Sequence, residues 1–233
     1  MDKRLLAGVM LVVLLSSSSG LKASGVVIHK EERPLRDTQV VLEGLLQEAP
    51  QDVEILCALA EVHFYLGDWV DSKEQIPLWE EGVAYAQKAV ELEPECAPAH
   101  YWVAVLWGKI GRARGVLQSL FLVNTIFEHL DRALSLDPDY SWAHFALSHI
   151  YQELPPKPLG KGDRQQALFC AQRAWELERT EPEFSVHYAK LLVRQRQFDQ
   201  ARGVLEEALT TSQDWTDPMR SQAEEILASL YTR

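Results

Sequence analysis

Histidine and cysteine often carry catalysis or bind metals in proteins, and this chain has seven histidines. His144 and His149 are five residues apart, so on a helix they lie on different faces, and no His-Glu-x-x-His motif is present. His63 and Glu61 are two residues apart, which again separates the two side chains on a helix. A Gly-x-Ser-x-Gly motif is also missing. The sequence therefore predicts no catalytic residue, no metal site, no cofactor and no enzymatic activity.

The three cysteines, Cys57, Cys96 and Cys170, are widely spaced, and their pattern is neither that of a zinc motif nor that of a disulfide framework. In an exported protein they could form at most one disulfide and leave one free thiol. Cys57 and Cys170 fall at apolar positions of expected helices, so we expect them to behave as small buried hydrophobic residues.

Lys109, Arg112 and Arg114 place three positive charges within a short stretch of an acidic chain. They could contact a carboxylate or phosphate near a turn, and the planar guanidinium of Arg112 or Arg114 would suit either anion. The alternative is a solvated turn in which these cations complement the end of a helix. The nearby glycines do not form a phosphate-binding loop, because no strand precedes them and the Gly-Lys-Ser/Thr ending is missing.

The elements that must position these residues are repeated helix pairs. Pro50, Pro94 and Pro138 recur at equal spacing, each after a helix-like segment, and proline ends a helix because it cannot continue the hydrogen-bonding pattern. Asp52 is the expected N-cap of the first paired helix, which closes at 67–68, and Asp163 is the expected N-cap of a later one. We expect residues 70–75 to form a loop, with extra residues inserted between paired helices at 70–81 and 112–125 and a Pro-rich loop at 154–162.

Four segments resemble first helices of tetratricopeptide repeats: LA at 59–60 with GDW at 67–69, VA at 103–104 with Trp107, LS at 147–148 with Tyr151, and YA at 188–189 with FDQA at 198–201. Small residues stand where the paired helices would cross, at Gly82, Ala89, Ala133, Ala167, Ala174, Ala201 and Ala208. The resemblance implies an all-α fold: a tetratricopeptide-like helical-repeat solenoid, a right-handed superhelix of antiparallel helix pairs with lengthened repeats. A helical bundle with accidental alanines is the alternative. We expect a capping helix within 26–51, four units over 52–210 and a second capping helix within 211–233.

Over about residues 52–210, the stretches GRARGVLQSL (111–120), LDPDY (136–140), YQELPP (151–156) and LGKGD (159–163) are similar to the T-component family of TRAP transporters. A weaker similarity runs to eukaryotic regulators of microtubule dynamics, which share lengthened repeats. The first resemblance implies a periplasmic accessory of an uptake system, which binds a small ligand, docks a solute-binding protein and can form homo-oligomers.

Residues 1–25 have the layout of a secretory signal, with Lys3 and Arg4 followed by an apolar run at 5–15 and then small residues. That run is too short to span a bilayer, which takes about 20 apolar residues. We therefore expect export to the periplasm, with an uncleaved N-terminal membrane anchor as the alternative. The net charge of -11 argues against nucleic acid and anionic lipid surfaces as main partners.

In the tetratricopeptide arrangement the first helix of each pair lines a concave groove. Projection onto that arrangement places eight candidate groove residues there, for a small hydrophobic or amphiphilic ligand or for the peptide of a partner protein: Phe64, Tyr65, Tyr101, Val105, Lys109, Trp142, Phe145 and His149. The same projection adds Val186, Lys190 and Arg194 at the end of the groove. The alternative is that many of the aromatic residues are ordinary core. The predicted function is thus an exported binding protein, either a transport accessory or a generic periplasmic scaffold for protein–protein interaction.

Overall fold

The computed structural model describes residues 32–213 and 215–232, with the side chains of residues 32 and 116–120 left undescribed. Over these residues the elements are ten α-helices, α2 to α11, and an isolated bridge joins Pro156 to Gly162. The all-helical prediction is confirmed for this part of the chain. None of the described helices is both long and apolar enough to cross a bilayer. The predicted signal or anchor at 1–25 lies outside the described residues.

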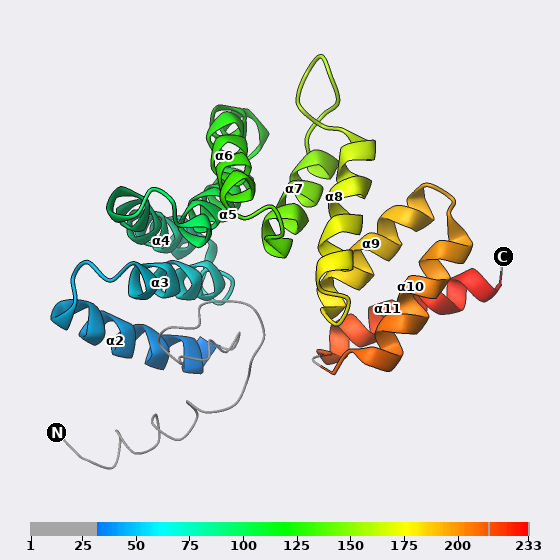
Figure 1. Ribbon diagram of the computed structural model, residues 1–233, viewed down its shortest axis with the longest axis horizontal. Helices are drawn as coiled ribbons and strands as arrows, with labels where there is room; N and C mark the ends of the chain where they lie inside the picture. Colours follow the sequence, from blue (N-terminus) through cyan, green and yellow to red (C-terminus); the bar gives the residue numbers. More distant parts are fainter. Residues whose placement is uncertain (1–31, 214, 233) are drawn as a thin grey trace, which may run out of the picture. The chain divides into compact units, whose positions relative to one another are not determined.

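The chain divides into two compact units, residues 1–136 and residues 137–233. Unit 1 is built from a lone helix and two helix pairs, in which α3 packs on α4 and α5 packs on α6 (Figure 1). Its first core cluster joins Leu35 and Leu42 of the lone helix to Leu59, Val62 and Leu66 of α3. The helices of unit 1 are α2 (Glu32–Glu48), α3 (Val53–Leu66), α4 (Ser72–Leu92), α5 (Ala97–Arg114) and α6 (Val116–Leu136).

The expected loop at 70–75 and the expected insertions at 70–81 and 112–125 are wrong, because most of these residues extend helices. α4 begins at Ser72 and contains Pro77. Pro77 has no backbone N–H, so the carbonyl of Lys73, four residues earlier, receives no helical hydrogen bond. Lys73 is exposed, so water can bind this carbonyl instead. α5 and α6 are separated by Gly115 alone, whose φ of 89° is available to glycine without strain. The repeats of unit 1 are therefore lengthened by longer helices.

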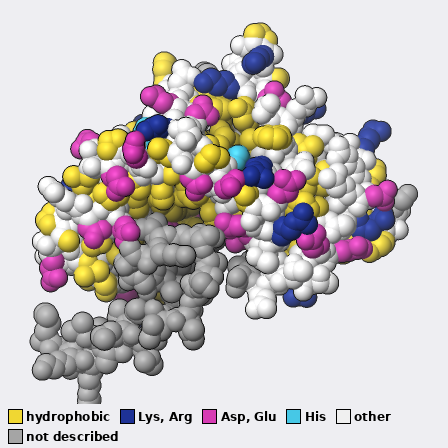
Figure 2. All heavy atoms as spheres, viewed as in Figure 1, with side chains coloured by type: hydrophobic (Ala, Val, Ile, Leu, Met, Phe, Trp, Pro, Cys, Tyr) yellow, Lys and Arg dark blue, Asp and Glu magenta, His cyan; other side chains and the backbone are white. Residues whose placement is uncertain are grey.

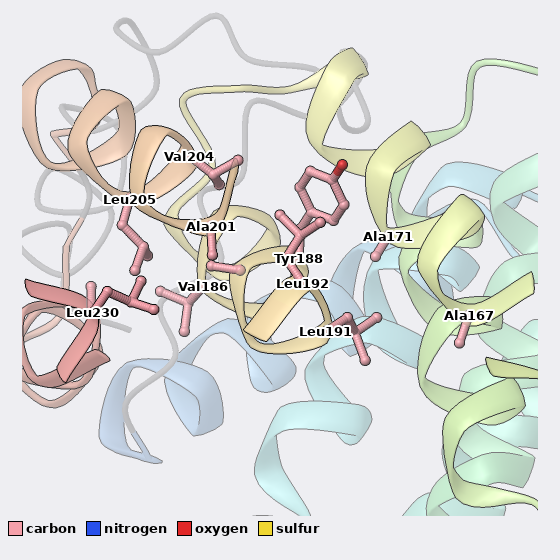
Figure 3. Close-up of a cluster of buried hydrophobic side chains, with 12 residues drawn as sticks. Ala167, Ala171, Val186, Tyr188, Leu191, Leu192, Ala201, Val204, Leu205 and Leu230 are labelled. Carbon is pink, nitrogen blue, oxygen red and sulfur yellow. The ribbon is translucent and has the colours of Figure 1, made fainter. Parts of the chain in front are cut away.

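Unit 2 has two helix pairs and a final helix that packs on α9 and α10. In its core, Tyr188 and Leu192 of α9 pack with Leu205 of α10 and Leu230 of the final helix (Figure 3). The Pro-rich loop between α7 and α8 has the predicted location, and the Gly162 amide donates to the Pro155 carbonyl at 2.9 Å. The helices of unit 2 are α7 (Ser141–Glu153), α8 (Arg164–Leu177), α9 (Pro182–Arg194), α10 (Phe198–Thr211) and α11 (Asp217–Tyr231).

The small residues at the helix crossings and the side-chain caps at the helix starts lie where the sequence predicts them. All seven predicted crossing residues, from Gly82 to Ala208, are buried. At Gly82 an added Cβ would lie 2.8 Å from the Cβ of His63, so a larger residue there would push α4 away from α3. Asp52 and Asp163 each accept two backbone amide hydrogen bonds at the start of their helices, as predicted.

Candidate binding surfaces

In unit 2 the structure brings three predicted groove residues together on one side of α7. Trp142, Phe145 and His149 are spaced three and four residues apart, so they share a face of the helix, and all three are half-buried. The Trp142 and Phe145 rings meet edge to face with centroids 5.7 Å apart, and Phe145 meets His149 at 4.7 Å. This spacing was readable from the sequence, and it forms a continuous aromatic row.

Two buried residues of α9, which the sequence analysis did not name, support this row from below. Phe184 lies 4.7 Å from the ring of Trp142 and 4.9 Å from that of Phe145. The His187 ring stacks on His149 with centroids 3.9 Å apart and an interplanar angle of 23°. The signal that could have found them is their spacing of three residues, just after the proline that starts α9. We call these five residues, Trp142, Phe145, His149, Phe184 and His187, the aromatic cluster.

His187 is neutral in this environment and serves as a hydrogen-bond donor. Burial lowers its pKa to about 2, and the neighbouring His149, Lys190 and Arg194 act in the same direction. Ser148 donates its hydroxyl proton to the Ala167 carbonyl at 2.7 Å, so it accepts from Nε2–H of His187 at 2.8 Å. The serine and histidine are thus hydrogen-bonded, yet the histidine is not placed to take the serine proton. The arrangement joins α7, α8 and α9 and does not activate a nucleophile.

Positive charge lies beside the aromatic cluster, toward the end of α9. Arg194 is exposed, and Lys190 is half-buried and donates to Gln222 of α11 at 2.8 Å. Burial and then Arg194 lower the pKa of Lys190, whereas Glu183 raises it. The placement of Val186 in an open groove is wrong, because its side chain is 3% exposed and belongs to the core shared with α10 and α11.

Unit 1 has its own aromatic group on α3 and α5. Phe64 and Tyr65 are half-buried and meet edge to face at 5.2 Å, and Phe64 also contacts Trp102 at 5.7 Å. Tyr101 is 6% exposed beside Trp102, so it packs as core, and Val105 is half-buried. The predicted groove residues of unit 1 therefore offer less aromatic surface than those of α7.

The three clustered cations of unit 1 have carboxylates nearby. Lys109 forms a salt bridge with Asp68 at 2.6 Å, and its ammonium group lies 4.5 Å from the centroid of the Phe64 ring. Arg114 pairs with Glu80 of α4, and Arg112 lies exposed in the last turn of α5. An anion that bound Lys109 or Arg114 would have to compete with a carboxylate of the protein itself.

Four of the six histidines in the described residues form two pairs, His100 with His129 and His149 with His187. The Nδ1 atoms of His100 and His129 are 2.9 Å apart, and Nε2 of His100 lies 3.1 Å from the Pro94 carbonyl. His100 must donate to that carbonyl, so its Nδ1 accepts from His129. Burial and His100 lower the pKa of His129. No group of three or more histidine, cysteine or carboxylate side chains that could hold a metal ion occurs in the described part of the chain.

Each unit shows hydrophobic side chains between acidic and basic ones on the face seen in Figure 2. Such mixed surfaces suit protein partners, because apolar contacts supply affinity and charged ones orientation.

Comparisons with known structures support the predicted repeat fold. The chain resembles a thermophilic tetratricopeptide-repeat protein of Thermus thermophilus, with a TM-score of 0.64, 20% identity and coverage of 86% of this chain and 92% of that one. It also resembles pilF of Pseudomonas aeruginosa, with a TM-score of 0.56, 15% identity and coverage of 84% and 81%. A tetratricopeptide family model matches residues 159–221. The tetratricopeptide-like fold is confirmed, and such repeats typically serve as non-catalytic scaffolds that bind other proteins.

Family comparisons favour the weaker of the two resemblances seen in the sequence. Regulator of microtubule dynamics protein 3 from Bos taurus is 35% identical over 66 residues, which are 28% of this chain and 14% of that protein. The matched segment thus spans only a small part of that relative. The family model described as regulator of microtubule dynamics protein 1-3 matches residues 26–151, more than half of the chain. The chain therefore belongs to the family of regulators of microtubule dynamics proteins 1-3.

Proposed function

We propose that this protein is a tetratricopeptide adaptor that binds a peptide segment of a partner protein across the aromatic cluster of unit 2. The observation that carries the proposal is the half-buried row of Trp142, Phe145 and His149, which ends beside the exposed cation of Arg194. The buried rings below the row restrict its rotamers, so little side-chain entropy is lost on binding.

The chemistry of the surface defines the ligand. Aromatic faces bind apolar or aromatic side chains, and the guanidinium of Arg194 binds a carboxylate in a planar, bidentate geometry. We therefore propose an extended peptide that carries an apolar anchor and, a few residues away, an acidic side chain or a free C-terminus. The relatives are described as regulators of microtubule dynamics, so tubulin is the first partner to test.

A selection from a phage-displayed library of random linear peptides tests the peptide proposal. We expect the selected peptides to combine aromatic or aliphatic residues with Asp or Glu. Fluorescence polarisation should then show roughly tenfold weaker binding or more for Arg194→Glu, because the charge contact becomes a repulsion. Lys73→Glu is the matched control, since it makes the same charge change on the exposed surface of unit 1 and should bind as the wild type.

Co-sedimentation with polymerised tubulin tests the partner in the same variants. Pelleting that Arg194→Glu reduces and Lys73→Glu preserves would support tubulin as the partner. Equal binding of peptides by Arg194→Glu and the wild type, or a library that yields no binder, would contradict the proposed surface.

A carrier of a small amphiphilic ligand, as in TRAP-type uptake systems, is the second candidate. The half-buried rings of Phe64 and Tyr65 beside the Lys109 ammonium favour it, because they offer an apolar surface next to a charge. Native mass spectrometry of the gently purified chain distinguishes the two candidates. A retained small mass that Phe64→Ala loses would support the carrier, and the same spectrum shows whether the chain forms homo-oligomers.

Export or membrane attachment through residues 1–25 is also part of the proposal, supported by the charged start and apolar run of that segment. The intact mass of the chain from membrane and soluble fractions provides the test. A mass without the segment indicates a cleaved signal and an exported protein, whereas the full mass in the membrane fraction indicates an anchor. The full mass in the soluble fraction alone would contradict both.

A further inference from the structure

Two histidines of unit 1 that are 29 residues apart in the sequence meet through the same ring nitrogen. The Nδ1 atoms of His100 on α5 and His129 on α6 are 2.9 Å apart, and their ring centroids are 5.0 Å apart. Helices α5 and α6 pack on each other as a pair, so the fold of the unit holds the two rings together. The two imidazoles therefore direct a nitrogen each at a common point.

The contacts of His100 fix its ring in the state that a metal ligand requires. Its Nε2–H donates to the Pro94 carbonyl at 3.1 Å, so its Nδ1 carries a lone pair, which faces His129. Histidines that bind metals in proteins share this arrangement, because the nitrogen that does not bind the metal donates to a carbonyl or a carboxylate and so orients the ring. His100 is also 8% exposed, so packing restricts its rotation.

His129 supplies the second nitrogen and the access from solvent. Its ring is half-buried, and its Nδ1 proton is the one that the two rings share. A metal ion that binds both Nδ1 atoms would displace this proton to Nε2 of His129, so both rings would remain neutral, as metal ligation requires. The metal would lie to one side of the line between the nitrogens, and the half-buried ring of His129 can turn to face it.

The separation of the two nitrogens indicates the kind of metal. Two nitrogens at about 2.0–2.1 Å from a metal lie about 2.9 Å apart when they bind at a right angle, and about 3.3 Å apart in a tetrahedron. Right angles between ligands are typical of square-planar and octahedral centres, which Cu(II) and Ni(II) form with nitrogen ligands. The distance of 2.9 Å between the Nδ1 atoms thus fits these two ions better than tetrahedral Zn(II).

Other histidines of the described residues lack one part of this arrangement. In unit 2, Nε2 of His144 lies 2.9 Å from the Pro138 carbonyl, yet the described residues offer its Nδ1 no hydrogen-bond partner. The rings of His149 and His187 stack at an interplanar angle of 23°, so their nitrogen lone pairs lie side by side and do not converge. A carbonyl-oriented ring that faces a second imidazole is found at His100.

We propose that His100 and His129 are two neighbouring ligands of a binding site for a divalent transition metal, Ni(II) or Cu(II). Water, or a donor atom of a second molecule, fills the remaining coordination positions. The bound metal joins the start of α5 to α6 and stabilises unit 1, because it binds the folded chain and not the unfolded one.

Isothermal titration calorimetry of the tag-free, full-length protein with Ni(II)–nitrilotriacetate tests the site, because this chelate leaves two neighbouring coordination positions open. We expect His129→Gln and His100→Gln each to bind the chelate roughly tenfold more weakly than the wild type or worse, since the second ring no longer adds to the first. His144→Gln is the matched control, because it removes a carbonyl-oriented histidine that has no second imidazole, and it should bind as the wild type. Equal affinity of the wild type and both pair variants would overturn the proposal.

NMR of the unaltered protein provides a second readout, which does not depend on how well the variants fold. Small additions of paramagnetic Ni(II) chloride should broaden the imidazole signals of His100 and His129 together and before those of the other histidines. Broadening that begins at another histidine, or at His129 without His100, would show that the two rings do not bind the metal jointly.

Discussion

Acid should destabilise unit 2 through His187, because this side chain is buried as the neutral form. Its pKa is lowered to about 2 by burial first, and then by His149, Lys190 and Arg194. Its hydrogen bond to Ser148 uses the proton on Nε2, so the neutral ring already satisfies its partner. Protonation would bury a charge next to the ring of His149 and near the cations of Lys190 and Arg194, all of which disfavour it.

The size of the effect follows from proton linkage. The unfolded chain binds a proton at His187 with the ordinary pKa of 6.5, whereas the folded chain does so only near pH 2. Between these values the unfolded state holds more protons, so stability rises with pH and is lost as pH falls below 6.5. From pH 7.5 to pH 5.0 the loss is about 2 kcal/mol. The loss is the same, about 2 kcal/mol, for any pKa of His187 in the folded state below about 4, because the folded protein then stays unprotonated at this residue between pH 7.5 and pH 5.0.

Urea unfolding of the wild type and His187→Gln at pH 7.5 and 5.0 measures this contribution. Glutamine retains a donor for Ser148 but has no titration in this range, so the pH-induced loss should be smaller in the variant by about 2 kcal/mol. Hydrogen exchange in α9 assigns the effect to unit 2. Carboxylates elsewhere contribute equally to both proteins and cancel. Equal losses in the two proteins, or an NMR titration of His187 with a midpoint near 6.5, would refute the reasoning.

Two further pairs of substitutions test the packing and the caps. In Gly67→Ala the new Cβ would lie 2.0 Å from Nε1 of Trp79, so urea unfolding should show a free energy of unfolding lower by about 1–3 kcal/mol. Gly44→Ala is the control, because its new Cβ would have nothing within 4 Å, and its free energy of unfolding should rise by about 0.5–1 kcal/mol. A neutral Gly67→Ala would show that Trp79 is free to move. Asp163→Ala removes two backbone hydrogen bonds from the start of α8 and should cost about 1 kcal/mol, and Asp163→Asn should recover most of it. Faster exchange restricted to the first turn of α8 is the expected signature, and protection equal to the wild type would contradict the cap.

Helix starts and ends were predictable because their signals are local. An aspartate side chain reaches the amides two and three residues ahead whatever the tertiary fold, so Asp52 and Asp163 were identified as caps from the sequence alone. The proline of LDPDY likewise ends α6 at Leu136, because the residue before a proline avoids helical geometry. The repeated small residues predicted the crossings for a similar reason, since each one marks a close approach of two backbones.

The helix extensions of unit 1 were missed because local signals there compete with packing. Pro77 indicates a helix start by itself, yet α4 begins five residues earlier at Ser72. The preceding turn is exposed and can hydrogen-bond to water, while Trp79 packs against Gly67 and donates to the Phe64 carbonyl at 3.2 Å. Tertiary contacts of this kind hold the helix at its register, and a single sequence does not show them.

The accessible part of each surface depends on neighbours that periodicity does not encode. Tyr101 and Phe145 occupy equivalent positions of the repeat, yet Tyr101 packs as core beside Trp102, whereas Phe145 is half-buried above Phe184. A helical period places a side chain on a face, and only the residues that pack against that face decide whether it can bind a partner. This is why the aromatic row of α7 was predictable as a row, while its buried support by Phe184 and His187 was not.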